Sequence, residues 1–102
     1  MNDKQIIINQ MMSGNEGVIS AGVNSESGIV ALNAILAGTR FRITDSTFIE
    51  GVRNIARKSC ESIMGIPLKK YAVASLHILG EELYNGNDPV INQFIKSNFE
   101  KE

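Results

Sequence analysis

Residues 44–64 read TDSTFIEGVRNIARKSCESIM and predict the clearest helix of the chain. Thr47 and Glu50 have the spacing of a capping box, in which two side chains satisfy free backbone N–H groups at a helix start. The charged residues alternate with the apolar ones as on an amphipathic helix. Seven residues advance by about three or four positions and share one face: Phe48, Val52, Ile55, Ala56, Cys60, Ile63 and Met64.

A tight corner separates this helix from a second one over residues 68–84. Gly65 suits the left-handed position after a helix, and Pro67 suits a first turn, where its missing N–H is not needed. We expect the two helices to pack antiparallel across this corner. Gly80 weakens the second helix by about 1 kcal/mol relative to Ala. Its core residues are expected to be Leu68, Tyr71, Ala72, Leu76, Leu79 and Leu83.

Both ends of the chain also predict helices. Asn2 or Asp3 caps the first one. Asp88 is the expected N-cap of the last one and Pro89 its first helical residue, a position that favours proline. Apolar residues recur at helical spacing in both, namely Ile7, Ile8, Met11 and Met12 in the first and Val90, Ile91, Phe94, Ile95 and Phe99 in the last.

Residues 29–36 are apolar except for Asn33, which predicts a helix buried on nearly all sides. Gly38 supplies its stop. Residues 39–44, TRFRIT, alternate between polar and apolar. A lone strand would leave its backbone unpaired, so this stretch is expected to be an extended connector. Its two apolar residues should point inward: Phe41 and Ile43.

Taken together, these patterns predict an all-α protein, a compact bundle of four to five short helices. Residues 13–28 carry four glycines among Ser and Asn, so we expect a flexible connection near the N-terminus. The length of 102 residues, the 43% of hydrophobic residues and the 21% of charged residues are ordinary for one globular domain. Residues 1–102 are therefore expected to form a single helical domain.

Cellular location is predicted from what the sequence contains. Cys60 is the only cysteine, so no intramolecular disulfide can form, which favours a reducing compartment. We see neither a signal peptide nor the run of about 18 apolar residues that a membrane helix needs. The expected location is the cytoplasm, without a membrane partner.

Residues with catalytic chemistry are few. His77 and Cys60 could form a thiolate–imidazole pair, but Cys60 belongs to an apolar stripe and His77 lies one helical turn before Glu81, where a surface contact is expected. A structural zinc site takes four Cys or His ligands, and the chain has two such residues. Glu81 and Glu82 diverge around a helix, which favours a solvated surface. We therefore predict no enzyme activity, cofactor or metal.

Basic residues concentrate in the middle of the chain. Residues 40–70 hold seven of the ten Lys and Arg against three acidic residues, a local net charge of +4, whereas residues 80–102 carry −3. This polarity predicts a local basic surface that could meet phosphates or an acidic protein. The candidate partner-binding residues are Arg53, Arg57, Lys58, Lys69 and Lys70.

The function favoured by these features is a non-catalytic, regulatory protein–protein interaction module, of the inhibitor, adaptor, chaperone or assembly-subunit type. It would bind another protein or itself through the basic surface and through apolar helix faces that one small core does not cover, notably residues 29–36 and the face of Phe94 and Phe99. Short chains often complete such faces across a symmetric interface, so a homo-dimer or higher oligomer is expected.

Two alternatives remain open. Residues 62–67 resemble the turn of a DNA-binding helix-turn-helix motif, whose recognition helix would begin at Leu68 and present Lys69 and Lys70. Glu61 occupies a position that is usually small there, so nucleic-acid binding is the weaker hypothesis. The segment from Gly14 to Gly28 could instead hold a phosphate or nucleotide ligand, although its spacing matches neither common glycine-rich motif.

Overall fold

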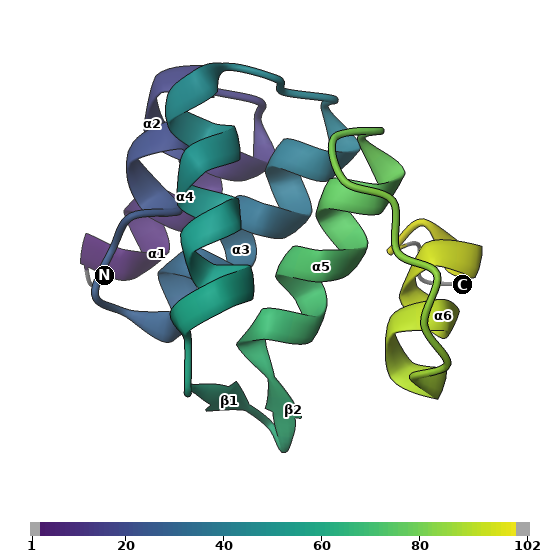
Figure 1. Ribbon diagram of the computed structural model, residues 1–102. Coiled ribbons are helices and arrows are strands. Elements are labelled where there is room, and N and C mark those ends of the chain that lie inside the picture. The colour runs from purple at the N-terminus through teal and green to yellow at the C-terminus, as the bar shows by residue number, and fades with distance from the viewer. Residues whose placement is uncertain (1–2, 100–102) are drawn as a thin grey trace.

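Six helices and one short hairpin make up residues 3–99, the part of the chain that this computed structural model describes. The all-α prediction is confirmed, since the only sheet in these residues is the two-stranded hairpin. The elements follow in this order (Figure 1): α1 (Asp3–Met12), α2 (Glu16–Gly22), α3 (Gly28–Arg40), α4 (Ser46–Lys58), β1 (Ser62–Ile63), β2 (Ile66–Pro67), α5 (Leu68–Ile78) and α6 (Pro89–Ser97).

The core forms around α3, which contacts α1, α2 and α5. Burial of this helix is confirmed for six of its apolar residues: Val30, Ala31, Leu32, Ala34, Ile35 and Ala37. At the ends of the predicted run, Ile29 is 40% exposed and Leu36 is half-buried. Gly38 is not its stop, because α3 continues to Arg40. A Cβ atom at Gly38 would overlap the Phe48 ring of α4, so this glycine leaves room for the ring to pack against α3. Thr39 is buried beside Ser75 of α5, with 2.6 Å between their hydroxyl oxygens.

The helix predicted over residues 44–64 is shorter at both ends. Asp45 is its N-cap, because the carboxylate accepts a hydrogen bond from the Thr47 N–H at 3.0 Å, so the capping box of Thr47 and Glu50 is wrong. At the other end α4 stops at Lys58 and the chain becomes extended at Ser59.

A β-hairpin replaces the last turns of the expected helix. Ser62 pairs with Pro67 and Ile63 with Ile66 in antiparallel register. Met64 and Gly65 form its tip with φ of 53° and 84°, so the left-handed Gly65 is confirmed. The prediction that Cys60 and Met64 lie on the core face is therefore wrong, because Cys60 is exposed and Met64 is 97% exposed.

The antiparallel packing of α4 and α5 is confirmed, since α4 runs towards the hairpin and α5 returns from it (Figure 1). Val52 and Leu76 are buried between them. However, α5 ends at Ile78, and Gly80 takes a left-handed φ of 77° just beyond it rather than lying inside a helix. Leu83 therefore lies in a loop and is 77% exposed, contrary to its predicted place in the core.

The N-terminal third contains one helix more than expected. Residues 13–28 were predicted to be a flexible connection, yet they include α2, which is capped by Asn15 and buries Ile19 against the core. This addition raises the count to six helices within residues 3–99. The predicted first helix is confirmed as α1, whereas Asn2 lies outside the described residues. Met11 is buried, but Met12 is 59% exposed.

The predicted connector over residues 39–44 is shorter than expected, because Thr39 and Arg40 belong to α3. Ile43 points inward as predicted. The same prediction is wrong for Phe41, which is 44% exposed.

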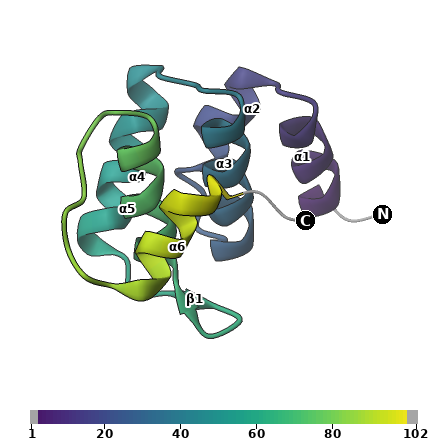
Figure 2. The same cartoon turned by 90° about the vertical axis from the view of Figure 1, so that its right-hand side faces the viewer.

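Helix α6 begins as predicted, since Asp88 Oδ1 accepts hydrogen bonds from the Val90 and Ile91 N–H groups. It packs on α5, on the side away from α3 and α4 (Figures 1 and 2). Within residues 3–99, no helix has both the length and the apolar character needed to cross a membrane.

Candidate functional site

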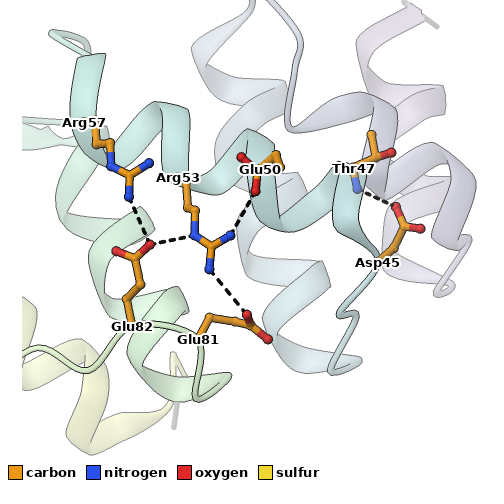
Figure 3. Close-up of polar contacts among 7 residues, drawn as sticks. All are labelled: Asp45, Thr47, Glu50, Arg53, Arg57, Glu81 and Glu82. Carbon is orange, nitrogen blue, oxygen red and sulfur yellow. Dashed lines mark hydrogen bonds and ion pairs between the residues drawn. The ribbon is translucent and has the colours of Figure 1, made fainter.

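Arg53 of α4 is the centre of the largest group of ion pairs among the described residues (Figure 3). Its Nε lies 2.6 Å from Glu82 Oε2 and its Nη1 lies 2.9 Å from Glu50 Oε2. Glu81 Oε1 is 3.6 Å from Nη2, and Arg57 Nη2 is 3.3 Å from the same Glu82 oxygen. The hydrogen bonds to Glu82 and then to Glu50 raise the pKa of Arg53. This cluster ties the segment after α5 to α4.

The acidic pair Glu81 and Glu82 was expected on the outer face of a helix. Because Gly80 ends that helix region with a left-handed turn, both carboxylates reach Arg53 instead. The predicted surface contact between His77 and Glu81 is also wrong. His77 Nδ1 accepts a hydrogen bond from the Tyr84 N–H at 2.9 Å, so its imidazole supports the loop after α5.

Lys70 of α5 contacts the cap of α6. Its Nζ lies 2.8 Å from Asp88 Oδ2, and the ammonium group, with help from the backbone N–H groups of Ile91 and Val90, holds the pKa of the Asp88 carboxyl below its ordinary value of 3.8. The Tyr84 hydroxyl accepts a hydrogen bond from the Asp88 N–H at 2.9 Å. Asp88 thus joins the loop, α5 and α6 at one point.

The five candidate partner-binding residues do not form one free basic surface. Arg53, Arg57 and Lys70 are all engaged by carboxylates of the same chain. Lys58 and Lys69 have no ion pair within residues 3–99, and they lie at the two helix ends that flank the hairpin. The acidic composition of residues 80–102 was the feature of the sequence from which pairing with the basic residues could have been suspected. The sequence does not show, however, that the turn at Gly80 brings Glu81 and Glu82 to the arginines.

A thiolate–imidazole pair does not form. Cys60 lies beside the hairpin, where α4 ends, whereas His77 lies near the opposite end of α5 (Figure 1). The Cys60 thiol is exposed, with Lys58 O at 3.9 Å. In the described part of the chain, no three His, Cys, Asp or Glu side chains are placed to hold a metal ion.

An open groove of about 330 Å³ lies between the α2–α3 connection and the end of α4. The glycine-rich segment contributes Val23, Asn24 and Ser25 to its wall, and α4 and the residues after it contribute Asn54 and Lys58 among others. Between residues 3 and 99, every buried polar side-chain atom has a hydrogen-bond partner. The buried polar atoms thus give no sign of a missing ligand, and ligand binding in this groove stays a prediction.

The corner between α4 and α5 differs from a helix-turn-helix. Residues 59–67 separate the helices, whereas that motif uses a turn of about three or four residues. The hairpin projects from the helical body (Figure 2), and Leu68 at the start of α5 donates its N–H to Glu61 O at 2.8 Å. The resemblance seen in the sequence therefore does not extend to the geometry.

Apolar surface is concentrated on one pair of helices. The faces expected to be in surplus are mostly covered, since residues 30–35 line the core and Phe94 stacks on Tyr71 at 4.5 Å. Within residues 3–99, four of the six large apolar side chains that are exposed belong instead to α1, to α3 or to the C-cap of α3. We call these four residues the α1–α3 patch: Ile6, Met12, Ile29 and Phe41.

Comparison with protein-family models, with curated proteins and with solved structures finds no match. The function has to be inferred from the surfaces of this chain.

Proposed function

We propose that the protein is a non-catalytic interaction module that binds another protein, in the first place a second copy of itself, through the α1–α3 patch. The observation that supports this is that four of the six exposed large apolar side chains in the described part of the chain lie on α1, on α3 or at the C-cap of α3, two helices that pack against each other. Apolar patches on a soluble domain commonly mark protein contact sites.

The make-up of α1 strengthens the case. A surface helix usually has one apolar stripe and one polar face. In α1, Met11 is buried and Ile7 packs on the core, while Ile6 and Met12 face outward. The Phe41 ring lies against Gly14, two residues beyond Met12, which places these two side chains at the same end of the helix pair. The four side chains of the patch are 40–59% exposed, so covering one of them would stabilise a complex by roughly half of the about 1.5–3 kcal/mol that burial of a fully exposed apolar side chain contributes, before the cost of association.

Two of the five candidate basic residues, Lys58 and Lys69, have no ion pair within residues 3–99 and suit the edge of such a module. Lys58 and Lys69 could contact an acidic partner, with an inhibitor, adaptor, chaperone or assembly subunit as the type of protein. A single cysteine that is exposed suits a reducing cytoplasm, where a free thiol persists.

The test replaces Met12 and Phe41 together by Ser. Sedimentation equilibrium at tens of micromolar, as a rough range, should show the wild type as a dimer and the double variant as particles of 11.1 kDa, because the variant loses the apolar contact. Leu83→Ser is the matched control, since Leu83 is exposed but lies outside the patch. A wild type that stays monomeric, or a double variant that associates as the wild type does, would contradict the proposal.

A further inference from the structure

Helix α6 is attached to the molecule without belonging to its core. The main cluster of buried apolar residues draws on α1 to α5 and the connections between them, and no residue of α6 is part of it. Among the described residues, α5 is the only helix that α6 contacts extensively, and α6 lies on its outer side (Figures 1 and 2). Separating α6 from α5 would therefore leave the core intact.

The contact between α6 and α5 is nevertheless specific. Phe94 stacks on Tyr71 with 4.5 Å between ring centroids and 23° between ring planes, and Phe99 completes the aromatic group at 5.4 Å from Phe94. Lys70 pairs with Asp88 at 2.8 Å. Ala74 of α5 is fully buried although it lies outside the main core cluster. The outer face of α5 thus offers a cation, an aromatic ring and a small residue to an amphipathic helix.

The connection between α5 and α6 has a short exposed stretch at which the chain could open, and we call it the hinge. Glu81 and Glu82 are held by Arg53, and Tyr84 is held by His77, so the chain is fixed up to Tyr84. The next three residues, 85–87, are exposed. Opening there would cost the hydrogen bond from the Asp88 N–H to the Tyr84 hydroxyl and the contacts of α6 itself.

We propose that α6 is an exchangeable arm, and that the site formed by Lys70, Tyr71 and Ala74 binds the α6 helix of a second copy of this chain. Exchange between copies reproduces the ring stack and the ion pair, so only the hinge and the entropy of association oppose it. The tethered arm competes at an effective concentration on the order of millimolar, so exchange grows with protein concentration or when the arm is weakened. This surface is separate from the α1–α3 patch.

The first test adds a fluorescent peptide of residues 86–99 to the full chain and measures anisotropy. Phe94→Ala in the full chain should bind the wild-type peptide about tenfold more tightly than the wild-type chain does, because its own arm competes less well. Adding Tyr71→Ala or Lys70→Ala to that variant should remove or weaken binding. Leu83→Ala, in the loop before the hinge, should match the wild type. Equal binding by the wild type and Phe94→Ala would overturn the proposal.

The second test mixes two full-length variants. Tyr71→Ala damages the site and Phe94→Ala damages the arm, so neither forms exchanged dimers efficiently alone. Both variants also carry Met12→Ser and Phe41→Ser, so that the α1–α3 patch cannot join them. In the mixture, the intact arm of the first reaches the intact site of the second, and hetero-dimers should appear in native mass spectrometry. A mixture that yields no hetero-dimer would overturn exchange between copies. Met12→Ser with Phe41→Ser should leave peptide binding unchanged, so failure of the α1–α3 patch and failure of the arm are separate results.

Discussion

At the scale of single residues, Gly38 and His77 illustrate what a linear pattern hides. A glycine after an apolar run predicts a helix end, but Gly38 lies inside α3. Glycine is needed there because the Phe48 ring of α4 occupies the space that a side chain would fill. His77 has helical spacing to Glu81, but its Nδ1 accepts the Tyr84 N–H once the helix has ended. Both roles depend on a contact partner that only the fold brings close. Neither role could therefore be predicted from the spacing of residues in the sequence.

Gly38→Ala is expected to destabilise the protein by about 1–3 kcal/mol, because the added methyl group overlaps a buried ring that cannot move aside freely. The matched control is Gly17→Ala in α2. There the nearest atom to a new Cβ is Asn15 Oδ1 at 3.7 Å, so the better helix propensity of Ala should stabilise by up to about 1 kcal/mol. Urea unfolding of the two variants measures the difference. A Gly38→Ala variant as stable as the wild type would show that the Phe48 ring does not pack tightly against Gly38.

At the scale of elements, the apolar periodicity predicted which segments form helices that pack in the core, but it did not predict the residues at which those helices end. The apolar spacing of residues 44–64 continues beyond Lys58, yet the chain turns into a hairpin whose tip places Met64 and Gly65 at positive φ. Likewise the apolar spacing that begins in α5 continues in the sequence to Leu83, although Gly80 turns the chain just after the helix ends. Asp88 and Pro89, whose capping chemistry is local, were assigned correctly.

Leu76→Ala should lower the free energy of unfolding by about 2–5 kcal/mol, since Leu76 is 2% exposed between α5 and the core and its removal leaves a cavity. Leu83→Ala removes the same atoms from a side chain that the sequence also assigned to the core but that lies in solvent. It should change the free energy by no more than about 0.5 kcal/mol. Chemical denaturation of both variants checks the end of α5, and similar losses would mean that residues 79–83 continue the helix into the core.

At the scale of the whole molecule, the fold class and the antiparallel α4–α5 pair followed from the sequence, whereas the candidate basic surface did not. The chain is polarised, with basic residues in its middle and acidic residues near its end. Composition alone cannot say that the two regions meet. The loop after α5 carries Glu81 and Glu82 back onto α4, and the surface that looked basic becomes a group of internal ion pairs.

Because these carboxylates neutralise the arginines of α4, we can predict how the protein binds nucleic acid. The wild type should bind DNA weakly and without sequence preference, because Arg53 and Arg57 are already paired. Glu81→Gln with Glu82→Gln should free Arg57 and release Arg53 from two of its three carboxylates, leaving its pair with Glu50. Binding should therefore strengthen, and the logarithmic dependence of affinity on salt should become steeper by about one, or by up to about two if phosphate also displaces Glu50. Glu16→Gln with Glu26→Gln makes the same change in net charge away from Arg53 and is the control. If both double variants gained the same affinity and salt dependence, net charge alone would explain the gain, and the local pairing at Arg53 would have no part in shielding the basic surface.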